Sequence, residues 1–204
     1  MQADSVIRHP KRDVLAVKLF ANGTETLQIF DLASKQKLKA HALGEQVALW
    51  KWVNDEQIGL VTLNAVYHWD LAGDAAPVKV FDRAPNLAST QVISYKVSPD
   101  RKWCVLIGIA AGAPEHPALV KGQMQLWSVE QQRTQALDAH AAAFAAVKLP
   151  GKDQPSTLIA FAQKTFVNGA INSKLHIIEL GAPGGGAPLK KQQELFFPPE
   201  VTFI

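Results

Sequence analysis

A strand-like segment followed by a run of lysines, residues 24 to 41 (TETLQIFDLASKQKLKAH), carries the side chains with the clearest binding chemistry. Successive side chains of a strand point to opposite faces, so Thr26, Gln28 and Phe30 share one face. That face presents a hydroxyl, an amide and an aromatic ring, and ammonium groups follow it in the chain. Such a surface suits an extended peptide with apolar anchors and carboxylates. The alternative is a solvated face, because basic runs are common on protein surfaces.

The segments on either side of this stretch have the pattern of short strands. Leu27 and Ile29 point away from the polar face and are expected in the core. An Asn-Gly pair separates the apolar runs at residues 14 to 20 and 26 to 32. Asn-Gly between two such runs is a strong signal for a β-hairpin, and we expect one here.

Short apolar runs continue from residue 47 to residue 180, separated by Asn, Asp, Gly and Pro. No long amphipathic helix is expected, although the alanine-rich residues 137 to 146 favour a helical turn or two. Four strand ends resemble one another: IFDL at 29 to 32, HWDL at 68 to 71, LWSV at 126 to 129 and IIEL at 177 to 180. Successive strand ends are 39, 58 and 51 residues apart. A weakly kept period of about 40 to 50 residues predicts the four-stranded blades of a β-propeller.

The composition excludes several classes of function. The chain of 204 residues has a net charge of only +3 and scattered basic residues, so no nucleic-acid site is predicted. No apolar run is long enough for a membrane helix, and the first residues lack the apolar segment of a signal peptide, so a cytosolic chain is expected. The lone cysteine, Cys104, lies in an apolar run and is expected to be a small buried residue.

No catalytic or metal-binding constellation is predicted, and no cofactor is expected. The six histidines are His9, His41, His68, His116, His140 and His176. They fall on different expected strands and turns, without a zinc-protease or serine-hydrolase motif. His41 and His140 follow similar turns and are interpreted as structural. The glycine-rich residues 181 to 188 lack the Lys-Ser/Thr of a phosphate-binding loop and are interpreted as a flexible connector.

Ten short segments together resemble the N-terminal β-propeller of clathrin heavy chain. They are LQIF at 27 to 30, KLKAH at 37 to 41, WKW at 50 to 52, NAVYHW at 64 to 69, VKVFDR at 78 to 83, QVISY at 91 to 95, MQLWSV at 124 to 129, HAAAF at 140 to 144, KLHIIEL at 174 to 180 and FFPPE at 196 to 200. The resemblance implies an all-β fold, a β-propeller fragment with about four of seven four-stranded blades. Residues 1–204 would form one partial domain, with the first blade incomplete or absent and the last blades and the α-helical leg absent.

The resemblance also implies a function without catalysis. The chain would be a structural component of clathrin-coated vesicles, and its propeller would bind short peptide motifs of endocytic and sorting adaptors during vesicle-mediated intracellular protein transport. In the full-length family the leg also binds clathrin light chain and trimerises. The expected location is the cytoplasmic face of coated pits and coated vesicles, with adaptors providing an indirect link to the membrane.

The family's main peptide groove, carried over residue by residue, falls on the segment described first. The implied residues are Leu15, Thr26, Gln28, Phe30, Lys35 and Lys37. Leu15 and Phe30 would bury apolar anchors, and Gln28 would bond the peptide backbone. The two lysines would face an acidic tail, through exposed ion pairs of only ~0.2–1 kcal/mol each.

Two further family sites map onto this sequence. The central site for tryptophan-containing peptides would use Gln91, Ile93 and Ile109, although isoleucines on inner strands are core residues by default. A third groove would use Trp103, Leu126 and Gln135. Gln131 stands where the family usually has arginine, which weakens the inference of acidic peptides there.

Two alternatives come from other classes of protein. A generic propeller-repeat scaffold would have a more regular repeat near 40 residues. A propeller hydrolase would need converging carboxylates and histidines at the central channel, usually around a metal. The sequence supplies no such cluster, so the binding function is preferred.

Overall fold

The computed structural model describes residues 3–21, 23–115, 120–151, 153–168, 170–181 and 190–195. Among these residues the regular elements are sixteen strands and one short 3-10 helix, which confirms the predicted all-β fold. The hairpin predicted around the Asn-Gly pair is present, because β2 and β3 pair antiparallel from Val14↔Asp31 to Ala21↔Thr24. The FFPPE segment, His116 and most of the glycine-rich connector lie outside the described residues.

The chain divides into two compact units, Met1–Arg83 and Ala84–Ile204. The first contains β1 (Ala3–Arg8), β2 (Val14–Ala21), β3 (Thr24–Asp31), β4 (Gln36–Leu43), β5 (Val47–Trp52), β6 (Gln57–Thr62), β7 (Ala65–Asp70) and β8 (Val78–Asp82). The second contains η1 (Pro85–Leu87), β9 (Gln91–Val97), β10 (Trp103–Ala110), β11 (Lys121–Ser128), β12 (Arg133–Leu137), β13 (Ala141–Val147), β14 (Ser156–Val167), β15 (Ala170–Leu180) and β16 (Lys190–Leu195).

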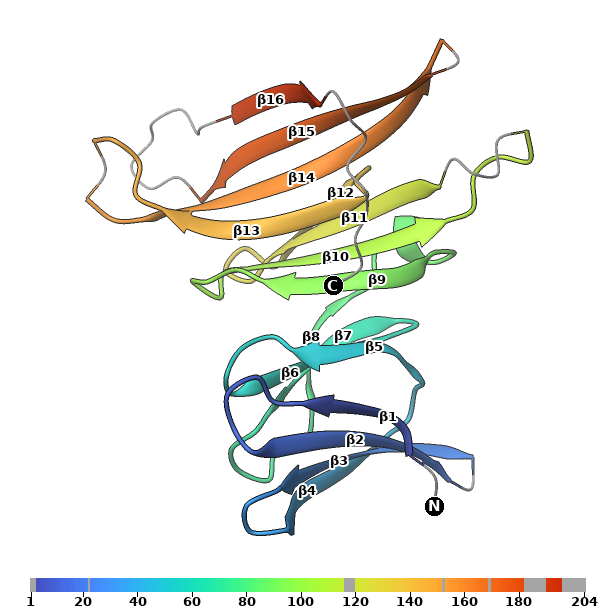
Figure 1. The fold of residues 1–204 in the computed structure, drawn as a ribbon, viewed down its shortest axis with the longest axis vertical. Coiled ribbons are helices and arrows are strands. Elements are labelled where there is room, and N and C mark those ends of the chain that lie inside the picture. The colour runs from blue at the N-terminus through green and yellow to red at the C-terminus, as the bar shows by residue number, and fades with distance from the viewer. Residues whose placement is uncertain are drawn as a thin grey trace. The chain divides into compact units, whose positions relative to one another are not determined.

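Each unit holds two four-stranded antiparallel sheets whose strands follow one another in chain order (Figure 1). Sheet 1 is β1–β4 and sheet 2 is β5–β8; sheet 3 is β9–β12 and sheet 4 is β13–β16. A four-stranded antiparallel meander is the blade unit of a propeller. The repeat of similar strand ends therefore predicted the sheets correctly.

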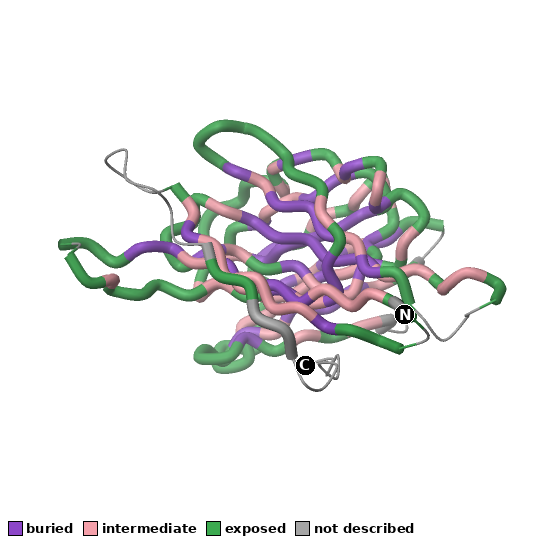
Figure 2. Tube along the Cα trace, turned by 90° about the horizontal axis from the view of Figure 1, so that it is seen from above, coloured by how far each residue is buried: buried purple, intermediate pink, exposed green. Residues whose placement is uncertain are grey.

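The first unit has its core between sheets 1 and 2. Leu27 and Ile29 are fully buried, as the strand alternation predicts, and they cluster with Ile58, Leu60 and Trp69 of sheet 2. Burying an aliphatic side chain of this size is worth ~1.5–3 kcal/mol. Figure 2 shows the same pattern along the chain, with buried residues in the middle of the strands and exposed residues at the turns.

The second unit has an equivalent core between sheets 3 and 4. Ile107 and Met124 of sheet 3 pack with Ile159 and Phe161 of sheet 4. The alanine-rich segment follows the pattern of short strands and not the helical alternative, because residues 141 to 147 form β13. This strand pairs with β14 along its whole length. Pairing and packing against neighbouring strands therefore override the intrinsic helix preference of alanine.

Cys104 is fully buried, as predicted from its apolar surroundings. Burial raises the pKa of its thiol to about 11, and a hydrogen bond with Tyr95 offsets only part of that rise. The thiolate is the reactive form, so we expect negligible reaction with a thiol reagent at pH 8 while the chain is folded. In denaturant the single cysteine should react fully. The absorbance of the released thiol-reagent product measures the rate of labelling. Equal rates in the folded and the unfolded chain would contradict the burial of Cys104.

Candidate functional site

Five of the six residues predicted for the main groove lie on one face of sheet 1. Across the strands, Leu15 of β2 pairs with Phe30 of β3, which pairs with Lys37 of β4. Gln28 and Thr26 lie in the next two rows of the same face, because directly opposed residues of antiparallel strands point to the same side. The opposite face of the sheet is the core. We call the face with these five residues the outer face of sheet 1.

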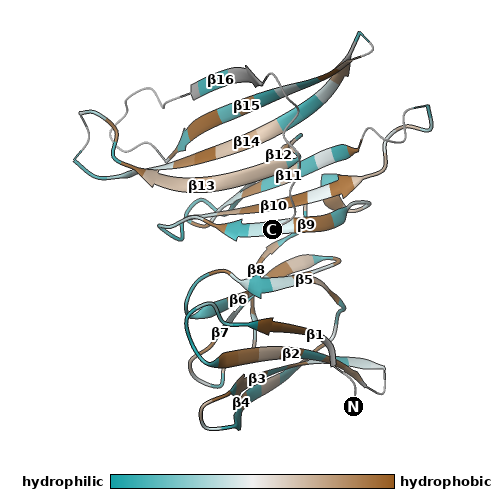
Figure 3. Ribbon diagram, in the orientation of Figure 1, coloured by the Kyte–Doolittle hydropathy of each residue, from teal (hydrophilic) through white to brown (hydrophobic). Residues whose placement is uncertain are grey.

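Within the first unit, the outer face of sheet 1 is open. Val6 of β1 pairs with Val17 of β2 on this face and is 49% exposed, while Leu15, Gln28 and Phe30 are half-buried. Figure 3 shows apolar residues along β1 and β2. The face therefore offers an apolar floor with an amide in its middle.

A β-bulge in β4 determines which lysines reach the outer face. Ile29 pairs with Lys39, but the next residue of β3, Phe30, pairs with Lys37, so Leu38 is the extra residue. Because a bulge shifts the register by one residue, Lys37 shares the outer face with Phe30, and Lys39 shares the buried face with Ile29. The alternation of lysines in the sequence gives no sign of this separation.

Lys39 consequently lies on the core side of sheet 1 and is a structural residue, away from the outer face. It is 9% exposed, and its Nζ donates hydrogen bonds to the carbonyl oxygens of Asp70 and Gly73. The same ammonium lies 5.0 Å from the centre of the Trp69 ring. Burial lowers the pKa of Lys39, and the nearby carboxylates of Asp70 and Asp74 offset part of that effect. Lys39 thus ties β4 to the turn that follows β7 of sheet 2.

Lys35 lies in the exposed turn between β3 and β4, with a positive φ of 56°. Asp31 shapes this turn, because its Oδ1 accepts hydrogen bonds from the backbone N–H of Ala33 (2.8 Å) and Ser34 (3.3 Å). The turn follows the end of β3 that carries Phe30. Lys35 and Lys37 therefore put positive charge at one end of the outer face.

Arg8 is a residue of this face that the sequence reasoning missed. It ends β1 opposite Leu15, so one row across the sheet reads Arg8, Leu15, Phe30, Lys37. Its guanidinium is exposed and bonds the carboxylate of Asp13 at 3.2 Å. The sequence did carry a signal for this placement: in a strand, Val6 and Arg8 point to one face and Ile7 points to the other. The row combines two cations with two apolar side chains, a pattern that fits a peptide with an apolar anchor beside a carboxylate.

The central site is only partly assembled in sheet 3. Gln91 of β9 pairs directly with Ile109 of β10, and Gln91 is exposed. Ile93 occupies a bulge, because Val92 and Ser94 pair with consecutive residues of β10. It also packs against the core of the second unit. Gln91 and Ile109 are therefore brought together, while Ile93 has the core environment that its residue type favours.

The third groove maps onto the face of sheet 3 that packs against sheet 4. Leu126 pairs with Gln135, but Leu126 is only 3% exposed and belongs to the core. Trp103 is half-buried and Gln135 is exposed, so these two residues offer the accessible surface. Gln131 lies exposed in the turn between β11 and β12, where its backbone N–H donates to Ser128 Oγ.

A nearby pocket between sheets 3 and 4, of about 500 Å³, was not predicted. Leu137, Phe161 and His176 form its apolar side, and the His176 ring stacks on Phe161 at 4.7 Å. Asn86 and Gln123 line its polar side, joined by a hydrogen bond of 3.0 Å. The ring and the two amides come from segments far apart in the sequence, so no local motif indicated them.

Two buried histidines have structural roles in their own units. The His9 ring accepts hydrogen bonds at Nδ1 from the backbone N–H of Lys11 and Arg12, and its Nε2 bonds Asp55 O at 2.9 Å. His140 likewise bonds Val120 O through Nε2 at 2.8 Å and accepts the Lys164 N–H at Nδ1. His9 thereby joins sheet 1 to sheet 2, and the His140 ring is held by backbone groups on either side.

The part of the chain that the structure describes contains no group of three or more His, Cys, Asp or Glu side chains placed to hold a metal ion. None of its helices is long and apolar enough to cross a membrane.

Comparison with known proteins shows what this chain is similar to. No protein-family model matches the sequence. Clathrin heavy chain 1 of Arabidopsis thaliana is 57% identical over 203 residues, covering 98% of this chain and 12% of the plant protein. The chain is homologous to a segment of clathrin heavy chain. Drosophila melanogaster clathrin heavy chain is 43% identical over 203 residues, covering 98% of this chain and 11% of its own length. The resemblance to clathrin inferred from ten short segments is therefore confirmed, and the chain spans about an eighth of the length of these relatives.

Solved structures support the architecture of this clathrin homologue. The β-propeller domain of the Trilobed protease from Pyrococcus furiosus has a TM-score of 0.51 and 10% identity, covering 97% of this chain and 59% of that domain. Acylaminoacyl peptidase from Pyrococcus horikoshii has a TM-score of 0.50 and 10% identity, covering 90% of this chain and 30% of its own. Likeness at this identity shows the fold alone, so it confirms a partial β-propeller and carries no inference of peptidase activity.

Proposed function

We propose that this chain is a peptide-binding part of a clathrin coat component, with the outer face of sheet 1 as its main groove. The observation that carries the proposal is the row Leu15, Phe30, Lys37, in which two apolar side chains and an ammonium group share one open face. Homology to clathrin heavy chain supports the coat assignment. Residues 1–204 would then supply about four of the seven blades of the propeller, and a further blade would cover the outer face and complete the groove.

The geometry supports a simple mode of recognition. Apolar anchors of an extended peptide would pack on Leu15 and Phe30, and the Gln28 amide would bond the peptide backbone between them. Carboxylates of the peptide would face Lys35 and Lys37. Each exposed ion pair contributes only ~0.2–1 kcal/mol, so binding should be micromolar and sensitive to salt. Useful avidity would then require several motifs in one partner.

The partners that follow from this proposal are adaptor and accessory proteins with short acidic and apolar motifs, at the cytoplasmic face of coated pits and vesicles. Clathrin light chain and self-trimerisation belong to the leg of the full-length family. The function needs no cofactor and no catalysis. This chain is similar to clathrin heavy chains along almost its whole length. That similarity favours a coat component over a generic repeat scaffold.

Fluorescence polarisation tests the groove with a labelled peptide of the pattern Leu-apolar-x-apolar-Asp. We expect saturable binding that weakens by about tenfold or more in Gln28→Ala/Lys37→Glu, since one backbone bond and one charge contact are lost. Lys148→Glu, an exposed charge change in the second unit, is the matched control. Unchanged binding by a folded Gln28→Ala/Lys37→Glu chain would show that the outer face of sheet 1 is not the groove.

A further inference from the structure

The hairpin of β14 and β15 projects beyond the rest of sheet 4 (Figure 1). β13 pairs with β14 only as far as Ala141↔Ala162, whereas β14 and β15 continue to pair through Val167↔Ala170. We call the segment of this hairpin from Gln163 to Ser173 the arm. Isolated two-stranded hairpins are marginal in water, so apolar residues displayed on such an arm need a reason.

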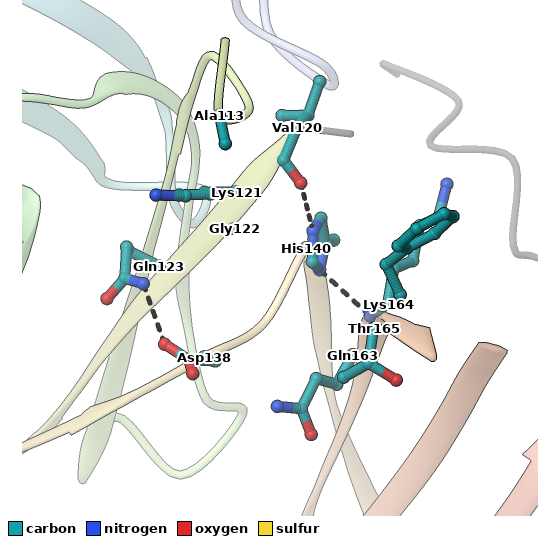
Figure 4. Close-up of a pocket in the computed structure, with 11 residues that line it drawn as sticks. Ala113, Val120, Lys121, Gly122, Gln123, Asp138, His140, Gln163, Lys164 and Thr165 are labelled. Carbon is teal, nitrogen blue, oxygen red and sulfur yellow. Dashed lines mark hydrogen bonds between the residues drawn. The ribbon is translucent and has the colours of Figure 1, made fainter. Parts of the chain in front are cut away.

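The arm forms one wall of a pocket of about 450 Å³ (Figure 4). Gln163, Lys164 and Phe166 line this wall. The wall opposite consists of Val120 and the first residues of β11, from Lys121 to Gln123. Both walls belong to the second unit. None of the twelve residues predicted for the three family grooves lines this pocket, and we call it the arm groove.

The floor of the arm groove is rigidly built. His140 lies there, held by the hydrogen bonds from Nε2 to Val120 O and from the Lys164 N–H to Nδ1 (Figure 4). The ring thus connects both walls. Gly122 has no room for a side chain, because an added Cβ would lie 2.3 Å from Ala139 O and 2.7 Å from His140 Cγ. The spacing of the walls is therefore determined by backbone and ring contacts.

The chemistry of the arm groove combines exposed apolar side chains with positive charge. Phe166 is 39% exposed and Val120 is 38% exposed, one on each wall. Lys121 and Lys164 add two positive charges. The only carboxylate among the lining residues, Asp138, accepts a hydrogen bond from Gln123 Nε2 at 2.8 Å. From residue 154 to residue 178 the sequence has no Asp or Glu, so the arm carries only the positive charge of Lys164, and Lys174 follows directly after it.

We propose that the arm groove is a separate binding site for an extended peptide in which an aromatic or aliphatic anchor is flanked by carboxylates. The anchor lies between Phe166 and Val120, and the carboxylates lie beside Lys164 and Lys121. A positively charged peptide is excluded because it would meet two lysines. An uncharged ligand would leave both ammonium groups unused. This site is independent of the groove on sheet 1, since its residues all belong to the second unit.

The test uses the whole chain carrying Gln28→Ala/Lys37→Glu, so that the groove on sheet 1 does not contribute. The probe is the fluorescein-labelled peptide Asp-Glu-Phe-Asp-Leu-Glu-Asp, with a control peptide in which lysine replaces every acidic residue. We expect the acidic peptide to bind saturably and the basic one not to bind. Adding Lys164→Glu/Phe166→Ser should weaken binding by about tenfold, whereas the matched pair Lys148→Glu/Phe20→Ser should leave it unchanged.

Nuclear magnetic resonance separates loss of binding from loss of structure. The His140 contact uses the backbone N–H of Lys164, so it should survive the side-chain substitution, and the amide signals of Gly122 and Lys164 should keep their folded positions. In the parent chain the same signals should shift on adding the acidic peptide. Absence of saturable binding by the folded chain, or equal binding by Lys164→Glu/Phe166→Ser, would overturn the arm groove. Neither result affects the proposed site on the outer face of sheet 1, because the peptide of the pattern Leu-apolar-x-apolar-Asp tests that site separately.

Discussion

Replacing Glu25 with alanine should destabilise the first unit by about 3–5 kcal/mol. Glu25 is buried, its Oε1 accepts the Val47 N–H at 3.0 Å, and its Oε2 lies 3.6 Å from Lys18 Nζ. Lys18 is equally buried and also reaches Val47 O at 3.4 Å. Glu25→Ala removes the carboxylate that faces this buried ammonium, and it leaves the Val47 N–H, at the start of sheet 2, without its acceptor. Urea unfolding followed by tryptophan fluorescence measures the loss.

Two variants show whether charge burial causes this effect. Glu25→Gln keeps an acceptor for the Val47 N–H and loses only the charge. Its free energy of unfolding should therefore lie between those of the wild type and Glu25→Ala. Glu130 forms a shorter but exposed pair with Lys102, at 2.6 Å, and Glu130→Ala should lower the stability far less than Glu25→Ala does, because water screens an exposed ion pair. If the two alanine variants had the same stability, burial of the pair on sheet 1 would be unimportant.

Local patterns in the sequence predicted the strands and the faces of β3. Alternation between Thr26 and Phe30 gave the correct partition between the outer face of sheet 1 and the core, and the Asn-Gly pair gave the correct hairpin. These features succeed because a strand has a side-chain period of two and a tight turn has strict backbone needs. The similar strand ends predicted the four-stranded sheets because each sheet repeats the same sequence of strands and turns.

The features that the sequence did not predict depend on contacts across strands or sheets. The bulge at Leu38 is visible only in the pairing of β3 with β4, and it separates Lys39 from Lys37. Arg8 joins the row with Leu15 and Phe30 on the outer face of sheet 1 only through the register of β1 with β2. The arm groove needs the relative lengths of β13 and β14, which follow from where pairing ends and not from the residue pattern.

Trp69→Ala should have a comparably large effect, with a loss of about 3–5 kcal/mol in the stability of the first unit. The side chain is 1% exposed, belongs to the core between sheets 1 and 2, and donates from Nε1 to Ala75 O at 3.1 Å. The substitution leaves a large cavity and an acceptor without its donor. It also removes the ring beside Lys39. Trp69→Phe keeps an aromatic ring and most of the volume, so its loss should be clearly smaller in the same urea titration.

The position of Trp69 also links the stability of the first unit to the proposed peptide site on the outer face of sheet 1. Lys39 holds β4 against sheet 2 through Trp69, Asp70 and Gly73, and the bulge at the preceding residue, Leu38, sets the direction of Lys37. Loosening this contact should let β4 move relative to Phe30. At a temperature where Trp69→Phe is still folded, we therefore expect weaker binding of the acidic peptide to sheet 1, although Trp69 belongs to sheet 2 and packs with the core residues of sheet 1, away from its outer face. Unchanged affinity would mean that pairing with β3 alone is enough to position Lys37.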